Sequence, residues 1–184
     1  MTYRRTAPPA FSSRFLGSIA ATSATLLVAG CATLMTPRAT ALLMPTAGNN
    51  TSGTVRFLQS GDKVQVSGEI RGLKPDAEHG FHVHEKGDCS SADGASAGGH
   101  FNPSGMPHGN HGVSMRHSGD LPALKAGAGG VATFSFESTG IAVGSGVNDI
   151  VGKALIVHRD ADDYTTQPTG NSGPRLACAV IQKT

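Results

Sequence analysis

The sequence predicts an all-β sandwich or barrel, and three observations favour it. Several short segments alternate apolar and polar residues in the manner of strands, and the 25 glycines suit the tight turns between them. No segment of convincing length has the apolar periodicity of an amphipathic helix. We therefore expect one domain of short strands packed around a single core.

The expected strands follow one another along the chain. Residues 39–44 form the first, and residues 54–59 alternate as the second. A Ser-Gly-Asp turn at residues 60–62 is a hairpin connection that leads into the third, residues 63–70. Later strands are expected at residues 79–85, 130–137, 154–158 and 175–182.

Two long segments do not have the pattern of strands, residues 86–120 and 159–174. Loops of this length in a compact domain are usually functional or disordered. The first segment holds most of the histidines, together with Gly and Ser. We therefore expect functional loops, and a bound metal would supply the order that they lack on their own.

Residues 1–30 are expected to be an export signal rather than part of the fold. Three arginines within the first 14 residues give a positive start, and residues 15–30 are mostly small and apolar. This stretch is too short and too rich in Ser and Thr for a convincing membrane span. Arg4-Arg5 could begin a twin-arginine signal, but the residues that follow do not support one, so we expect general secretion.

Residues 27–31 read Leu-Val-Ala-Gly-Cys, which resembles a bacterial lipobox, where cleavage precedes the cysteine and the cysteine is then lipidated. We expect a lipid on Cys31, a short tether over residues 31–38, and the folded domain over residues 39–184. This predicts a periplasmic protein anchored to a bacterial membrane, with the outer membrane favoured. The alternative is a plain secretory signal that is cut elsewhere, with Cys31 incidental.

The charge of the mature protein argues against a nucleic-acid partner. The chain has a formal net charge of +2, with 15 basic and 13 acidic residues, but three of the basic residues lie in the export signal. Without those three the body of the protein is nearly neutral. Nucleic-acid binding needs a basic patch or stripe, so we expect no nucleic-acid partner.

Cysteine usage fits an exported protein. If Cys31 carries a lipid, Cys89 and Cys178 remain as an even pair, and oxidising compartments favour a disulfide. A disulfide that closes a loop of about 90 residues stabilises a fold by about 4 to 5 kcal/mol in the chain-entropy model. The alternative is two free buried thiols.

The histidines are strongly clustered. Seven of the 8 histidines lie between His79 and His117, and neutral imidazole is the commonest protein ligand for zinc and copper. His82 and His84 alternate on a predicted strand, so both point to one face and can converge on one ion. A surface pair of histidines would have the same spacing.

Two donor sets follow from the residue types and their spacing. Three imidazoles and one carboxylate in the first long loop form a closed set that suits tetrahedral zinc: His100, His108, His117 and Asp120. A distant histidine after an apolar strand can complete a second set, whose four nitrogens suit Cu(II): His82, His84, His100 and His158.

Five motifs, taken together and in this order, resemble the Cu,Zn superoxide dismutase family. They are HGFHVHE at residues 79–85, GHFNP at 99–103, the histidines and aspartate at 108, 117 and 120, VH at 157–158, and GPRLAC at 173–178. They span nearly all of the predicted domain. The resemblance implies an eight-stranded Greek-key β-barrel or sandwich with long metal-binding and electrostatic loops.

The resemblance also implies the ligands, with one copper and one zinc per subunit. The family's copper ligands fall on His82, His84, His100 and His158, and its zinc ligands fall on His100, His108, His117 and Asp120. In the family, His100 would bridge both metals through its two ring nitrogens. Asp162 matches the carboxylate that links a copper histidine to a zinc histidine, and His79 matches a histidine that ties a loop to the barrel.

Arg175 matches the family arginine beside the copper, where a permanent positive charge attracts an anion. The alternative is an arginine that only pairs with a loop carbonyl. Arg175 and His100 are the expected catalytic residues. Thr169 matches, more loosely, a threonine at the channel mouth. His111 has no counterpart; we expect a solvated loop histidine, with a stray metal contact as the alternative.

The implied activity is superoxide dismutation. Two superoxide anions and two protons become dioxygen and hydrogen peroxide as copper alternates between Cu(II) and Cu(I), which would protect the cell envelope from extracytoplasmic superoxide. Cys89 lies only five residues after His84, and the stretch from His158 to Arg175 is short. Both features resemble the bacterial exported branch, and they leave the steering residues and the choice between monomer and homodimer open.

Two other classes of function fit the sequence less well. A lipoprotein that only buffers periplasmic copper or zinc would need the zinc set, but it would need neither Arg175 nor an open copper position. A structural adhesion or interaction domain has no reason to hold seven convergent ligands. The presence of every expected copper ligand together with Arg175 favours the enzyme.

Overall fold

The computed structural model describes residues 1–2 and 36–184. Most of the predicted export signal over residues 1–30, and Cys31 with the start of the tether, lie outside the described residues. Among the residues that are described, no helix is both long and apolar enough to cross a membrane.

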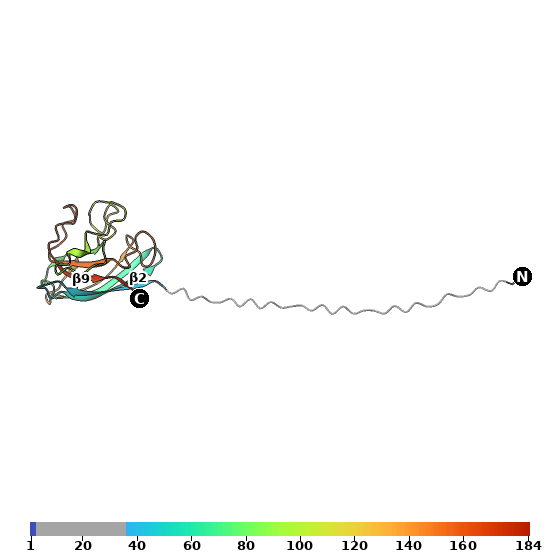
Figure 1. Ribbon diagram of the computed structural model, residues 1–184, viewed down its shortest axis with the longest axis horizontal. Coiled ribbons are helices and arrows are strands. Elements are labelled where there is room, and N and C mark those ends of the chain that lie inside the picture. Colours follow the sequence, from blue (N-terminus) through green and yellow to red (C-terminus); the bar gives the residue numbers. More distant parts are fainter. Residues whose placement is uncertain (3–35) are drawn as a thin grey trace. The chain divides into compact units, whose positions relative to one another are not determined.

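Eight strands form one antiparallel sheet that curls into a half-barrel (Figure 1). The strand order is β5-β8-β9-β1-β2-β3-β7, with β10 paired to β1. The bounds are β1 Arg38–Pro45, β2 Ser52–Ser60, β3 Lys63–Arg71, β5 Phe81–His84, β7 Ala132–Ser138, β8 Ala154–His158, β9 Arg175–Val180 and β10 Gln182–Lys183. The jumps from β3 to β7 and from β1 to β9 are the crossovers of a Greek key, so the all-β prediction is confirmed.

Alternation of apolar and polar residues explains why the first strands of the sheet form where they do. On β2, the side chains of Val55 and Phe57 are buried while Arg56 is exposed, which is the two-residue period of a strand with one face on the core. The predicted hairpin is present, since Ser60 pairs with Lys63 across a tight turn. The apolar side chains of both halves of the curled sheet merge into one core cluster.

Two predicted strands are divided in the structure. The segment 79–85 splits at Gly80 into β4 Glu78–His79 and β5, because the Gly80 N–H donates to the Asp160 carbonyl and the Gly80 carbonyl accepts from the His158 N–H. β4 then pairs with β6 Leu124–Lys125, a strand that the sequence did not predict. The segment 175–182 splits in the same way at Ile181, whose N–H donates to the Lys153 carbonyl.

The two long loops lie on the same side of the barrel, the green one at residues 86–120 and the red-brown one at residues 159–174 (Figure 1). Both lack strands, as predicted, and the first contains one 3-10 turn, Ala95–Ala97. A disulfide joins Cys89 in the first loop to Cys178 on β9, which confirms the predicted pair. Because Cys178 is buried, the disulfide fastens this loop to the sheet.

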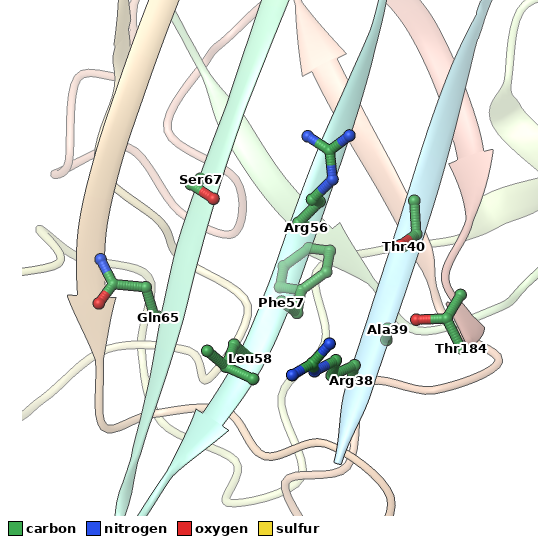
Figure 2. Close-up of a pocket in the computed structure, with 9 residues that line it drawn as sticks. All are labelled: Arg38, Ala39, Thr40, Arg56, Phe57, Leu58, Gln65, Ser67 and Thr184. Carbon is green, nitrogen blue, oxygen red and sulfur yellow. The ribbon is translucent and has the colours of Figure 1, made fainter. Parts of the chain in front are cut away.

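A shallow groove lies on the outer face of β1, β2 and β3 (Figure 2). Small polar side chains such as Thr40 and Ser67 form its floor, and Arg38 and Arg56 stand on it. Figure 2 shows that the two guanidinium groups extend in different directions rather than converging on a shared point. The groove contains none of the predicted metal ligands.

Candidate metal centre

Strand β5 presents two of the predicted copper ligands. His82 and His84 alternate along it and are both buried. One edge of β5 pairs with β8, where His82 lies opposite Ile156 and His84 lies opposite Ala154. The strand pairing therefore brings β8, which ends at His158, alongside both histidines, although 74 residues separate His84 from His158.

The other edge of β5 binds two pieces of the first long loop. The Phe101 N–H donates to the Val83 carbonyl at 2.8 Å, and the Val83 N–H donates to the Gly119 carbonyl at 2.9 Å. These bonds place His100 and Asp120 next to the strand. Position 119 must be glycine for this close approach, since a Cβ atom there would overlap the Val83 carbonyl oxygen.

The predicted zinc residues form a tight cluster around one carboxylate oxygen. The Nδ1 atoms of His100, His108 and His117 lie 2.9, 3.1 and 3.3 Å from Oδ1 of Asp120. The Nδ1 atoms of His117 and His100 are 3.3 Å apart. Tetrahedral zinc with bonds of about 2.0–2.1 Å separates its ligand atoms by roughly 3.3 Å, so these four atoms have spacings that suit one zinc ion.

The backbone fixes the orientation of Asp120. Its second oxygen, Oδ2, accepts hydrogen bonds from the N–H groups of His117 and Gly109 at 3.0 and 3.1 Å. That leaves Oδ1 directed at the three imidazoles. Although burial acts in the opposite direction, the hydrogen bonds with the histidines hold the pKa of Asp120 well below its usual range, so the carboxylate is ionised and ready to act as a ligand.

The predicted copper residues form a second cluster, and all four are buried. The Nε2 atoms of His84 and His158 are 3.4 Å apart, and the rings of His82 and His100 stack with centroids 4.0 Å apart. Within the described residues, Nδ1 of His82 and Nε2 of His100 are buried with no hydrogen-bond partner. Buried polar atoms rarely lack a partner, so both nitrogens have the character of metal ligands.

Three of the four copper-side histidines, all except the shared His100, direct their outward ring nitrogen at a hydrogen-bond acceptor. Nε2 of His82 donates to Asp162 at 2.7 Å, Nδ1 of His84 donates to the Gly98 carbonyl at 2.9 Å, and Nδ1 of His158 donates to the Gly173 carbonyl at 3.1 Å. Each bond fixes one tautomer and leaves the inward nitrogen without a proton, as a metal ligand requires.

Burial favours the neutral form of His84, His100 and His158. It lowers the pKa of His100 to about 4 and that of His158 to about 3, and it lowers the pKa of His84 well below the ordinary value. Neighbouring histidines also lower the pKa values of His84 and His158. Because a protonated imidazole cannot bind a metal, the lowered pKa values favour binding at neutral pH.

Asp162 connects the two clusters. One carboxylate oxygen accepts from His82 at 2.7 Å and the other lies 2.8 Å from Nε2 of His108. The structure therefore brings together a histidine of each donor set at one buried carboxylate, in the arrangement that the resemblance implies.

Arg175 is half-buried at the start of β9. Its guanidinium donates to the carbonyl oxygens of Gly94 and Gly98, the second at 2.6 Å. The positive charge of Arg175 is close enough to His84 and His158 to contribute to the lowering of their pKa values, although burial and neighbouring histidines contribute more. Arg175 therefore does both things that the sequence suggested: it pairs with loop carbonyls, and it lies close to the copper-side histidines.

Three further predicted residues have distinct positions. His79 is buried, and its Nδ1 donates to the His158 carbonyl at 2.9 Å, which ties β4 to β8. His111 is half-buried rather than solvated, because its Nδ1 donates to the Asp120 carbonyl at 3.0 Å and its ring packs edge-on against Phe136. Thr169 is half-buried.

The sequence did not indicate roles for Gly98 and Gln167. Gly98 contributes only a carbonyl oxygen, shared by His84 and Arg175. Gln167 binds the backbone of His108. Neither residue could be recognised from its type. Every residue has a backbone carbonyl like the one that Gly98 contributes, and glutamine is common in loops.

Comparison with known proteins gives consistent matches. The family of copper/zinc superoxide dismutases (SODC) matches residues 51–181. A Cu-Zn superoxide dismutase of Paramecium bursaria Chlorella virus 1 is 46% identical over 136 residues, 70% of this chain and 71% of the viral protein. An extracellular Cu-Zn superoxide dismutase of Brugia pahangi is 40% identical over 157 residues, 80% of this chain and 77% of that protein. Among solved structures, the clock protein EA4 matches with a TM-score of 0.72 and 40% identity, over 80% of this chain and 95% of that one.

Proposed function

The chain belongs to the copper/zinc superoxide dismutase family, and we propose that its two buried donor clusters hold the two metals. The protein is a superoxide dismutase with copper and zinc as cofactors. Copper is assigned to His82, His84, His100 and His158, and zinc to His100, His108, His117 and Asp120. The observation that carries this assignment is that His100 belongs to both clusters, with Nδ1 toward Asp120 and Nε2 buried without a partner.

Bound copper supplies one-electron oxidation and reduction of superoxide, and the residues of the chain supply the field, the geometry and a place for a proton. Hydrogen peroxide formation needs two protons for each turnover. Nε2 of His100 can hold one of these protons and release it again, because two neighbouring side chains keep the ring in place. Asp120 and the stacked ring of His82 provide that restraint.

Arg175 is assigned to substrate attraction. Its guanidinium keeps its charge at any physiological pH, and two loop carbonyls hold it in one position. Superoxide is a small anion, so a fixed positive charge near the copper cluster raises its local concentration; superoxide dismutases are an established example of such electrostatic steering. The charge of Arg175 contributes to the lowered pKa values of His158 and His84, which supports the assignment.

We further propose that the protein is exported, and that it belongs to the bacterial lipoprotein branch of the family. The Cys89–Cys178 disulfide and the relative named as extracellular support export. The bacterial branch rests on the lipobox-like residues 27–31 and on the short second loop. In this proposal residues 1–30 are the signal, Cys31 carries the lipid, residues 31–38 are the tether, and the enzyme lies in the periplasm.

The metal assignment is tested with His158→Ala. The purified variant should keep zinc and the fold, because His158 is outside the zinc cluster. It should lose copper and at least 100-fold of its activity, since loss of a group that only supports a ligand already costs roughly 10- to 100-fold. His111→Ala is the control for loss of an imidazole outside both clusters, and it should keep copper, since its contact with Asp120 is on the zinc side. A His158→Ala variant that dismutates superoxide at the wild-type rate would show that copper is bound elsewhere.

Export and lipidation need a separate test. Cells that express the full chain should incorporate labelled palmitate into the protein, and the Cys31→Ala variant should not. In cell fractionation, the Cys31→Ala variant should move from the membrane fraction to the soluble periplasmic fraction, because its lipid anchor is absent. Absence of label from the unsubstituted chain would contradict the lipoprotein assignment and leave the enzymatic one unaffected.

A further inference from the structure

Gln167 makes a two-point contact with the backbone of a proposed zinc ligand. Its Oε1 accepts from the His108 N–H at 2.9 Å, and its Nε2 donates to the His108 carbonyl at 2.9 Å. The two residues are 59 positions apart, so this contact joins the second long loop to the first. An amide side chain offers a donor and an acceptor on one planar group, which suits a pair of backbone partners.

The loop that carries Gln167 is braced from within. The Asp163 carboxylate accepts from the N–H groups of Thr165 and Thr166 and from the Thr166 hydroxyl. The ends of the segment are joined as well, because the Asp163 N–H donates to the Gly170 carbonyl at 2.9 Å. The segment 163–170 is therefore held together by hydrogen bonds between its own residues.

Asp162 and the adjoining segment 163–170 contact His108 at three points. Asp162 accepts from the His108 ring, Gln167 binds the His108 backbone, and Gly170 packs against the Asp162–His108 pair. Gly170 has φ of +68°, and a Cβ atom there would overlap the Asp162 carboxylate. Side chain and backbone of His108 are thus held by the same loop.

We propose that Gln167 is a positioning residue for the zinc site, and that it acts by docking the 163–170 segment on the backbone of His108. The inference rests on the proposed zinc set. Gln167 sets the direction from which His108 presents Nδ1 to the metal, while Asp162 sets the tautomer of the ring. Gln167 is itself exposed, so its removal should leave the core intact and act on the zinc site.

The substitutions follow from the two bonds. Gln167→Met keeps the length of the side chain and removes both bonds, while Gln167→Glu keeps an acceptor for the His108 N–H but places a second oxygen against the His108 carbonyl. The matched control is Gln59→Met. Gln59 also bonds to backbone groups of two segments, with Oε1 accepting from the Val143 N–H, but it contacts no proposed ligand.

The experiment uses the processed protein loaded with copper and zinc. Zinc affinity is measured by competition with a chromophoric chelator, and the shape of the site is measured from the visible absorption of Co²⁺ bound in place of zinc. We expect Gln167→Met to weaken zinc binding about 10-fold, at the lower end of the effect of residues that support a ligand, and to change the Co²⁺ bands. Gln167→Glu should weaken binding by an intermediate factor, and Gln59→Met should leave both readouts unchanged.

Two results would overturn the role of Gln167. One is zinc affinity and Co²⁺ absorption in Gln167→Met that equal those of the unsubstituted protein. The other is an equal loss of zinc affinity in Gln59→Met, which would mark a general loss of stability. Failure of the unsubstituted protein to bind stoichiometric zinc would instead overturn the zinc assignment itself, and the role of Gln167 with it.

Discussion

His84 and Arg175 donate to the same oxygen atom, the carbonyl of Gly98. Nδ1 of His84 is 2.9 Å from it, and a guanidinium nitrogen of Arg175 is 2.6 Å from it. One peptide group thus sets both the ring direction of a proposed copper ligand and the position of the charge that is proposed to attract superoxide. The Cys89–Cys178 disulfide ties the loop that carries this peptide to β9, the strand that Arg175 begins.

The charge of Arg175 should control the rate of substrate capture. We expect Arg175→Glu to lower kcat/KM roughly 10- to 100-fold at low salt, within the range of electrostatic effects on association, without loss of either metal. Raising the ionic strength should slow the unsubstituted enzyme and should not slow the variant, because screening weakens attraction only where attraction exists. Arg175→Lys is the control that keeps the charge and loses the fork to Gly94 and Gly98. Equal rates in Arg175→Glu and the unsubstituted enzyme would remove this residue from the site.

The disulfide should contribute strongly to stability. Its two cysteines are 89 positions apart, so the double variant Cys89→Ser, Cys178→Ser should lose about 4 to 5 kcal/mol of unfolding free energy in the chain-entropy model. Chemical denaturation of the metal-free protein, with and without a reductant, measures this loss. A reductant should destabilise the unsubstituted protein and leave the double variant unchanged. A loss below about 1 kcal/mol would mean that the loop is held by its other contacts instead.

Zinc binding should release a proton from His108. Burial lowers the pKa of this residue, but the hydrogen bonds with Asp120 and Asp162 outweigh burial and raise it to about 9 in the metal-free protein. Since the raised pKa lies above the ordinary value near 6.5, the stabilisation by protonated His108 is fully present below about pH 6.5 and is lost as pH rises through 9. At pH 8 the ring is protonated, and zinc must displace that proton.

Calorimetry in buffers with different ionisation enthalpies measures this release. An ordinary histidine is mostly neutral at pH 8 and has no proton to release when zinc binds. Release of about one proton on zinc binding at pH 8 therefore comes from His108. The release should fall toward zero as the pH is raised above 9. The Asp162→Asn variant should release less at pH 8, because one of the two carboxylates that raise the pKa is lost. No proton release at pH 8 in the unsubstituted protein would contradict the raised pKa.

The sequence predicted the zinc cluster better than its surroundings. His100, His108, His117 and Asp120 occur within one loop, so their residue types and spacing were enough to suggest a site. The copper cluster also needs His158, which only the pairing of β5 with β8 brings to the other histidines. Local patterns showed only that His158 could complete this set, and the resemblance to a known family made the assignment definite.

Contacts made by the backbone escaped prediction for a physical reason. Gly80 interrupts a predicted strand because its partners, Asp160 and His158, arrive from a segment some 80 residues away. His111 was expected to be solvated, yet the Asp120 carbonyl lies within hydrogen-bond distance of its ring. In each case the deciding partner is a peptide group, and every residue of the sequence has one, so the sequence does not mark which one is used.

Electron paramagnetic resonance on protein with Cu(II) in one cluster and Co(II) in the other decides whether a single imidazole joins the two metals. Both clusters include His100, with opposite ring nitrogens turned toward each. A ring bonded to both ions couples their unpaired electrons, so the Cu(II) signal seen with diamagnetic zinc should disappear when Co(II) replaces the zinc. A Cu(II) signal that survives undiminished in the Cu(II)–Co(II) protein would show that His100 does not join the metals.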